Sequence, residues 1–328
     1  MVAGGRRSPA TSSRRGSETG VVGMLAFTIR RILWLLPVLF LVALTTFTLM
    51  HLVPGGPWSG EKKLPDQAQA NLERKYGLDK PVYEQFGRYL LDLAQGDLGS
   101  SYRQSNRPVR DILVEQAPRT AVLGLMALTV AIVLGVSLGV LSAMRQNTVI
   151  DYASVMFATF GASVPSFVLG MLLLTLFSRY LHWLPTSGWG TWKQAIMPVT
   201  ALSVLPTAYI ARVTRASMLE VLGQDYIRTA RSKGLREQVI VLRHVIRNGL
   251  IPVLTVIGPV AAALVTGSFI IEYLFSIPGI GRYFVTSISA RDYGMIMGTT
   301  LFYTTVVVTA NLIVDLLYAV VDPRIKYQ

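Results

Sequence analysis

Long apolar segments with few or no charged residues recur along this chain, and they restrict its fold more than any other feature. A helix needs about 20 mostly apolar residues to cross a membrane, because the hydrocarbon core is ~30 Å thick and each helical residue rises ~1.5 Å. Several segments of the 328-residue chain reach this length; 52% of its residues are hydrophobic and only 15% are charged. The pattern predicts an all-α integral membrane protein that crosses the bilayer several times.

Six transmembrane helices are predicted from these segments. They are expected at about residues 32–52, 121–144, 152–177, 195–212, 249–271 and 297–321. The connections of interest are a long polar segment after the first span, a basic loop after the fourth and a polar-aromatic hairpin after the fifth: residues 54–118, 213–247 and 272–296. The predicted organisation is therefore a tail (1–23), the first span (24–53), the polar segment (54–118), a five-helix core (119–322) and a C-terminal end (323–328).

Basic residues are concentrated on one side of these spans. The formal net charge is +13, and most Lys and Arg residues lie in the N-terminal tail and the 213–247 loop. Cytoplasmic loops of membrane proteins carry such an excess, so both termini and this loop are expected in the cytoplasm, and residues 54–118 and 272–296 outside it. The Gly-, Ser- and Arg-rich tail, residues 1–23, is expected to be disordered. The chain is expected to lie in membrane lipid and to bind no nucleic acid.

The sequence offers no catalytic or metal-binding constellation. It has no cysteine, and its three histidines, at positions 51, 182 and 244, lie far apart. The stretch GGPWSGEKK fails as a phosphate-binding loop, because Glu61 follows Gly60 where the loop requires a lysine. We therefore predict no catalytic residue, metal or cofactor on this chain, and a transport protein rather than an enzyme.

The basic loop contains a short segment, DYIRTARSKG (225–234), with the signals of a complete helix. Asp225 can accept hydrogen bonds from the first free N–H groups, and Gly234 suits the left-handed position after a helix. The other residues form an apolar face and a basic last turn: Tyr226, Ile227 and Ala230, then Arg231 and Lys233. A helix of ~8 residues is not stable alone in water. It must pack either on its own membrane domain or in another protein.

The continuation RSKGLREQVIVLRHVIRNGLIPVL is similar to the EAA loop of permeases from ATP-binding-cassette (ABC) importers, in the form of the peptide and nickel branch. The matching positions are Ala230, Gly234, His244, Asn248 and Pro252. The family's other motifs follow in order from Met24 onward: LVPGGPW, YGLDKPVYEQF, GDLGSSY, NRPVRDIL, PRTAVLGL, SIPGIGRYFVTSISARDYG and NLIVDLLYAVVDPR. The chain resembles the first (B-type) of the two permease subunits, although Arg228 and Thr229 replace the first letters of the EAA motif and Gly56 stands where the family often has Asp.

The resemblance implies a type I ABC importer permease in a bacterial or archaeal cytoplasmic membrane. Such a permease would form, with a second homologous permease, a path for peptides, nickel or other small solutes. An extracytoplasmic binding protein would deliver the solute, and two cytosolic ATPase subunits would bind ATP and Mg²⁺. Substrate identity is not implied, because selectivity in this family lies largely in the binding protein.

The resemblance also implies roles for particular residues. The ATPase-coupling helix would consist of Asp225, Tyr226, Ile227, Arg228, Thr229, Ala230, Arg231, Lys233 and Gly234, supported by His244, Asn248 and Pro252. Its apolar face, at positions 226, 227 and 230, is expected to enter a groove of the ATPase.

Candidates for the path or gate are Pro165, Pro206 and Asp315. A proline inside a span kinks the helix, so a kink is expected at Pro165 in the third span. Such prolines are tolerated where neighbouring helices or a cavity compensate for the lost hydrogen bond. A carboxylate in lipid costs about 2.5–3.5 kcal/mol on insertion scales, so it usually turns inward. For Asp315 we favour a polar contact near the cytoplasmic end over a gating role.

Two other classes of function are weighed against this interpretation. A secondary transporter driven by an ion gradient often has inverted repeats and intramembrane charges. This sequence has no convincing internal repeat and one clearly embedded charge. A membrane enzyme is disfavoured because no catalytic constellation is found.

Overall fold

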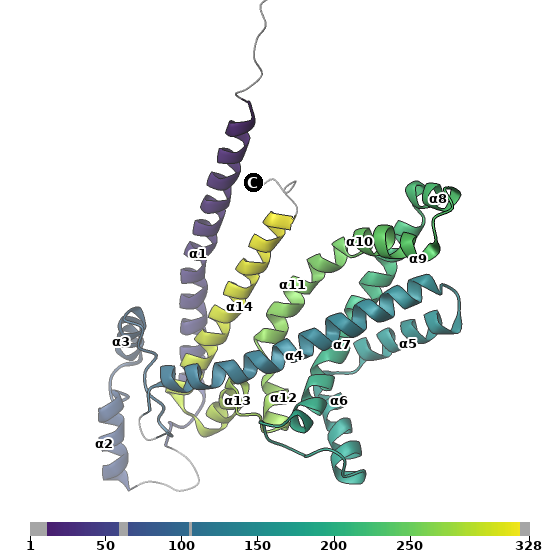
Figure 1. Ribbon diagram of the computed structural model, residues 1–328. Coiled ribbons are helices and arrows are strands. Elements are labelled where there is room, and N and C mark those ends of the chain that lie inside the picture. Colours follow the sequence, from purple (N-terminus) through teal and green to yellow (C-terminus); the bar gives the residue numbers. More distant parts are fainter. Residues whose placement is uncertain (1–11, 59–64, 105–106, 322–328) are drawn as a thin grey trace, which may run out of the picture.

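The structure, a computed structural model, describes residues 12–58, 65–104 and 107–321, with backbone only for residues 12–28 and 315–321. The described chain is helical throughout, and its one β feature is an isolated bridge between Ser100 and Pro108 (Figure 1). The elements are α1 (Ser12–Leu52), α2 (Asp66–Tyr76), α3 (Val82–Ala94), α4 (Val109–Met144), α5 (Val149–Ser163), α6 (Ser166–Leu173), π-helix η1 (Leu174–Tyr180), α7 (Trp192–Leu222), α8 (Asp225–Ser232), α9 (Glu237–Ile240), π-helix η2 (Val241–Val245), α10 (Ile246–Gly249), α11 (Ile251–Val265), α12 (Phe269–Leu274), α13 (Ile280–Ala290) and α14 (Tyr293–Val321).

Four of the described helical segments are long and apolar enough to cross a membrane unbroken: Ile29–Leu52, Val109–Met144, Trp192–Leu222 and Tyr293–Val314. Two further pairs pass the same test but are bent, Val149–Ser163 with Ser166–Tyr180 by 102° and Glu237–Gly249 with Ile251–Val265 by 49°. By length and composition, the described chain therefore has four candidate spans, or up to six if each bent pair is one span. The predicted all-α membrane class is confirmed.

The N-terminal end and the third span differ from the sequence predictions. Helix α1 begins at Ser12, so residues 12–23 are helical where disorder was predicted; residues 1–11, like 322–328, lie outside the described residues. The third span is not one kinked helix, because the chain breaks at Pro165 between α5 and α6. Proline excludes the preceding residue from the helical region, and Val164 is indeed extended.

Helix α4 begins earlier than the predicted second span. It starts at Val109, inside the polar segment that was predicted to precede that span. Val109 and Ile112 are buried here and pack with Ile280 of α13 and Met295 of α14. This apolar contact explains why the helix is continuous, and the predicted boundary between residues 118 and 119 falls inside it.

A row of small residues lets α4 lie against α7 and α11. Gly124, Ala127, Ala131, Gly135 and Gly139 are all buried on one side of α4. A Cβ atom at Gly124 would overlap the carbonyl of Leu264 in α11, and one at Gly139 would lie 2.6 Å from the carbonyl oxygen of Ala211 in α7. Small residues allow such close backbone packing in membranes, where lipid is as apolar as the side chains.

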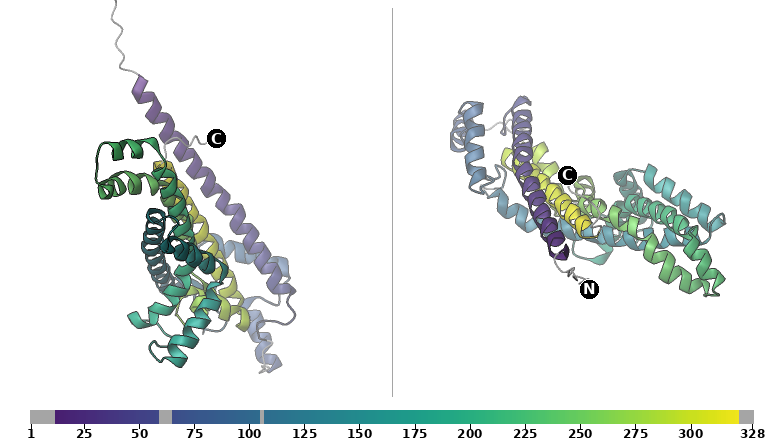
Figure 2. Two further views of the ribbon diagram at one scale, coloured as in Figure 1. Left: turned by 90° about the vertical axis from the view of Figure 1, so that its right-hand side faces the viewer. Right: turned by 90° about the horizontal axis from the view of Figure 1, so that it is seen from above.

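The two ends of the molecule have different characters. Helices α8, α9 and α10 lie at one end, where the last turns of α14 and the first part of α1 also lie, while α2, α3, α12 and α13 lie at the other (Figure 1). A second view shows α8 and α9 projecting sideways from the bundle (Figure 2). We call these the α8 end and the α13 end.

Candidate functional site: a helical loop at the α8 end

Helix α8 begins at Asp225, one residue before the start that an Asp225 cap would give. The capping position is held by Gln224, whose backbone is extended, and no side chain caps the helix. The Asp225 carboxylate is almost fully exposed and lies 3.6 Å from Arg228 Nη1. The prediction of an Asp225 cap was wrong by one position; the carboxylate instead lies in the first turn, where it faces the positive end of the helix dipole.

The buried face of α8 packs on its own chain. Ile227 and Ala230 belong to a buried cluster with Met218 of α7, Ile240 of α9 and Val245 of η2. The expectation that Ile227 and Ala230 enter a groove of another protein is therefore wrong. The chain folds back after α8, so α9 and η2 cover this face, and the packing stabilises a helix too short to persist alone.

The end of α8 follows the sequence prediction. Gly234 has φ +73°, and its N–H donates to the carbonyl oxygen of Arg231 at 2.9 Å. After this turn, the Arg231 guanidinium donates to both carboxylate oxygens of Glu237 at 2.7 and 3.3 Å. The two contacts join the end of α8 to the start of α9 across an exposed turn.

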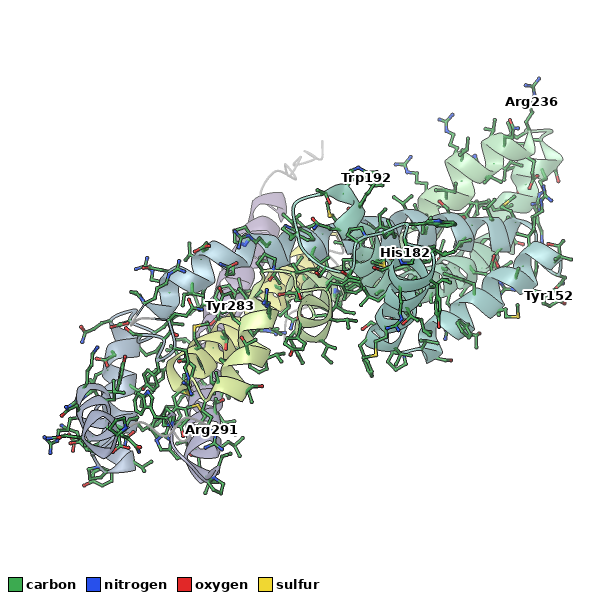
Figure 3. All side chains as sticks on the ribbon, turned by 90° about the horizontal axis from the view of Figure 1, so that it is seen from below. Tyr152, His182, Trp192, Arg236, Tyr283 and Arg291 are labelled. Carbon is green, nitrogen blue, oxygen red and sulfur yellow. The ribbon has the colours of Figure 1, made fainter. Side chains whose placement is uncertain are left out.

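Exposed apolar and basic side chains gather on the loop from α8 to α10, beside the exposed carboxylates of Asp225 and Glu237. Arg236 lies at the far tip of the molecule, opposite Arg291 at the α13 end (Figure 3). The exposed apolar side chains of this loop are Tyr226, Leu235, Val239 and Leu242, and the exposed basic ones are Arg228, Arg231, Lys233, Arg236, Arg243 and Arg247. We call this set the exposed loop face. Sequence reasoning missed Leu235, Val239 and Leu242, although their spacing of four and three residues is a helical signal.

The predicted supporting residues take different positions. Asn248 Nδ2 lies 3.2 Å from the Tyr226 hydroxyl and 2.9 Å from the backbone oxygen of His244, so it links α8 to α10. Thr229 is exposed, and its hydroxyl donates to the Asp225 carbonyl. Pro252 lies at the start of α11, near the 49° bend, where a missing N–H is tolerated.

An ion pair that the sequence did not indicate joins three spans near this loop. Arg215 of α7 donates to both carboxylate oxygens of Asp151 in α5, at 2.7 and 2.9 Å. Ser142 of α4 donates to the same carboxylate at 2.5 Å, as does the N–H of Asn147 at 2.9 Å. Asp151 is only 2% exposed. The charged and polar donors offset the cost of burying the carboxylate.

The three path candidates lie in different parts of the structure. Pro165 precedes α6 at the 102° bend, and Pro206 is half-buried inside α7. A cavity of about 290 Å³ lies near the Asp151–Arg215 pair and is lined by Ser154 and Arg212 among others. Asp315 lies in α14, and its side chain is outside the described residues.

Among the described residues, no group of three or more His, Cys, Asp or Glu could hold a metal ion.

Comparison with known families shows to which family the chain belongs. Residues 135–327 match the family described as binding-protein-dependent transport system inner membrane component, and residues 24–124 match its N-terminal family. The chain belongs to this permease family. The resemblance inferred from the loop motifs is thereby confirmed.

Curated relatives match the permease along its length. It is 44% identical over 306 residues to the oligopeptide transport system permease protein OppB of Escherichia coli K12, which covers 93% of this chain and 100% of the relative. It is 44% identical over 303 residues to the dipeptide transport system permease protein DppB of Lactococcus lactis, with coverage of 92% and 100%. These relatives are transport permease subunits, in agreement with the prediction of a transport protein.

Solved structures support the fold. The MetNI methionine ABC transporter in an inward-facing conformation matches 64% of this permease and 96% of that chain, with a TM-score of 0.53 and 19% identity. An amino acid ABC transporter crystallised with histidines matches 63% and 93%, with a TM-score of 0.51 and 17% identity. At these identities the match concerns the fold alone.

Proposed function

We propose that this permease imports peptides through a path that it forms with a second homologous permease, driven by two cytosolic ATPase subunits and supplied by an extracytoplasmic binding protein. Peptides are favoured over nickel because relatives named as oligopeptide and dipeptide permeases align with it over their whole length at 44% identity. The observation that carries the proposal is the exposed loop face on a short helix that the chain itself holds in place.

In this proposal α8 is the coupling helix, and the exposed loop face docks on an ATPase. The ATPases close on ATP and move α8, and hydrolysis and release reverse the movement. Ile227 and Ala230 pack in the same cluster as Ala143 of α4 and Met218 of α7, so a displacement of α8 moves both spans. The Asp151–Arg215 pair ties α5 to the same unit. Alternating access follows if these spans turn together.

We further propose six spans in a bacterial or archaeal cytoplasmic membrane, with both termini and α8 in the cytoplasm. Each bent pair then contributes one span; in the second pair Ile251–Val265 crosses the membrane, while Glu237–Gly249 belongs to the cytoplasmic loop. The start of α1 and the end of α14 lie at the α8 end, and α2, α3 and the α12–α13 hairpin lie at the opposite end, where they would receive the binding protein (Figures 1 and 2). The basic loop and the basic N-terminal segment support this orientation.

Reporter fusions test the orientation. A reporter at residue 85, in α3, should be active only as an extracytoplasmic protein, and one at residue 235, after α8, only as a cytoplasmic protein. Paired alkaline phosphatase and green fluorescent protein fusions give opposite signals on the two sides. The reverse pattern at either position would overturn the proposed topology.

Co-purification tests the function. The tagged permease, extracted in mild detergent, should retain two ATPase subunits and a second permease, and vesicles containing the complex should take up labelled peptide only with ATP. A permease that transports alone on an ion gradient would overturn the proposal and favour a secondary transporter.

A matched pair of variants connects this test to the exposed loop face. Leu242→Glu places a charge on that face, where Leu242 is 69% exposed, and should reduce retention of the ATPase about tenfold, because a charge would be desolvated in the interface. Leu91→Glu, at a 67% exposed leucine of α3, should leave retention unchanged. Equal retention in the two variants would remove Leu242 from the docking surface.

A further inference from the structure

The α12–α13 hairpin contains a fully buried acidic side chain that the proposed function does not use. Glu272 lies in α12 and is 0% exposed. The hairpin packs against α4 and the start of α14 at the α13 end, where Tyr283 of α13 is seen (Figures 1 and 3). Acidic residues are almost never fully buried unless they are paired. The contacts of this carboxyl therefore decide its protonation state.

One carboxyl oxygen of Glu272 has partners and the other has none in the described chain. Oε2 accepts hydrogen bonds from the N–H of Gly281 at 2.8 Å and from the hydroxyl of Thr120 in α4 at 3.2 Å. The same Thr120 oxygen accepts the N–H of Ile280 at 3.0 Å. Oε1 is buried without a hydrogen-bond partner among the described residues, and so is the Tyr303 hydroxyl of α14, which lies within electrostatic range.

Three glycines enclose the carboxyl closely. A Cβ atom at Gly279 would overlap Glu272 Oε2 and lie 2.6 Å from the Thr120 hydroxyl oxygen. A Cβ atom at Gly281 would lie 3.0 Å from Oε2, and one at Gly267 would lie 2.7 Å from Oε1. The backbone of the hairpin thus approaches the carboxyl on both sides, which leaves no space for a counter-ion side chain from these positions.

The elements packed around Glu272 bring no cation to it. The nearest basic residue of α4, Arg119, donates instead to Gln116 and to the Pro278 carbonyl oxygen at 3.4 Å. On α13, Arg282 contributes its backbone N–H, and Tyr303 on α14 is a neutral neighbour. Helix α6 has no charged residue. Burial raises the pKa of the Glu272 carboxyl to about 7, against the lowering effect of the hydrogen bonds from Gly281, Thr120 and Arg282.

We propose that the Glu272 carboxyl is a proton-binding site that positions the α12–α13 hairpin against α4, and that loss of this proton loosens the hairpin during transport. Only the second half of this proposal, the loosening of the hairpin during transport, rests on the proposed function. Glu272 is a positioning residue, since it acts through the Gly279–Gly281 turn and not on the solute. The bound proton removes the charge that burial disfavours.

The sign of the pH dependence follows from the raised pKa. The packed hairpin binds more protons than the loosened one, in which Glu272 regains an ordinary pKa. Packing is therefore strongest below pH 4.5, weakens as the pH rises, and reaches its minimum above the packed-state pKa of about 7. The hairpin opening equilibrium should increase roughly 70-fold between pH 5 and pH 8.

Hydrogen exchange on the assembled complex in lipid nanodiscs tests the first half. In nanodiscs both faces of the membrane share one pH, so the result does not depend on topology. After correction for intrinsic exchange, the amides of Ile277 and of residues 279–281 in the wild-type complex should exchange faster as the pH rises from 5 to 8. An infrared band of a protonated carboxyl should disappear over the same range. Exchange that is flat across this range would overturn the proton site.

Glu272→Gln is the decisive variant, because an amide preserves the shape and the acceptor at Oε2 but does not titrate. The variant should lose both the pH-dependent exchange and the infrared band. Glu115→Gln, at an exposed carboxylate of α4 paired with Arg107, should keep both. A Glu272→Gln complex that retains the pH dependence would overturn the assignment to this residue.

Peptide uptake into vesicles tests the second half separately. The wild-type rate should increase several-fold from pH 5 to pH 8, and the Glu272→Gln rate should lose this dependence relative to wild type. If hydrogen exchange of the hairpin depends on pH and the rate of peptide uptake does not, Glu272 has no role in transport. If the complex takes up no peptide at any pH while exchange still follows pH, the proposed function fails and the proton site stands.

Discussion

Replacing Gly234 with proline should abolish ATP-driven uptake while the permease still inserts into the membrane. Gly234 has φ +73°, whereas proline fixes φ near −65°, and proline also removes the N–H that donates to Arg231. The end of α8 would then unwind, and the exposed loop face would lose its position against the spans. We expect at least about a tenfold loss of uptake with ATP hydrolysis retained, as uncoupling requires.

Uptake and ATP hydrolysis should be measured together on the reconstituted complex. Gly223→Ala, at the other end of the same loop, provides the control, because Gly223 has ordinary helical dihedrals and an added Cβ would lie no closer than 3.4 Å to a neighbour. Gly234→Asn should retain much of the activity, since asparagine tolerates the left-handed region. Normal coupled uptake by Gly234→Pro would contradict the role assigned to α8.

Replacing Arg215 with methionine should destabilise the permease and impair transport. The change removes both hydrogen bonds from the guanidinium and leaves the Asp151 carboxylate buried with only Ser142 and the Asn147 N–H as donors. Breaking one partner of a buried ion pair costs on the order of 3 kcal/mol, and the partial exposure of Arg215 places this pair at the lower end of that range. Thermal unfolding of the purified complex measures the loss.

A double-mutant cycle distinguishes the pair from general damage. Asp151→Asn combined with Arg215→Met removes the unpaired charge, so the double variant should be more stable than Arg215→Met alone. Stabilities that simply add would show that the two residues are not coupled. An Arg215→Met complex with wild-type stability would show that the pair does not hold α5 against α7.

The fold class could be predicted because the bilayer imposes a length and an apolar composition on each span. Helix ends were predictable where local chemistry sets them, and Gly234 ends α8 as its sequence indicated. The start of α8 lies one residue before the predicted one, because both Gln224 and Asp225 can precede the first turn of a helix. The break at Pro165 was predicted only as a kink, since its angle depends on packing with other helices.

The functional loop was predicted less completely than the fold. Amphipathic spacing indicates that Ile227 and Ala230 are buried, but it does not say in which protein, and the cluster with Met218 is formed by residues distant in sequence. The Asp151–Arg215 pair joins positions that the predicted boundaries assigned to a turn and a loop, so no local pattern connected them. The buried state of Glu272 likewise depends on α4, which lies about 150 residues earlier in the chain.

The backbone contacts made by α4 restrict how this permease can change shape. Where carbonyl groups of α7 and α11 meet glycines of α4, one helix cannot slide along another without forcing a larger residue into the same place. Shear between α4, α7 and α11 is thus blocked, and these helices must rotate as one rigid body. The flexibility needed for such a rotation then falls on the breaks inside the two bent apolar pairs, at Pro165 and at Leu250. Stiffening the chain at Leu250 should therefore slow every cycle without altering a path candidate.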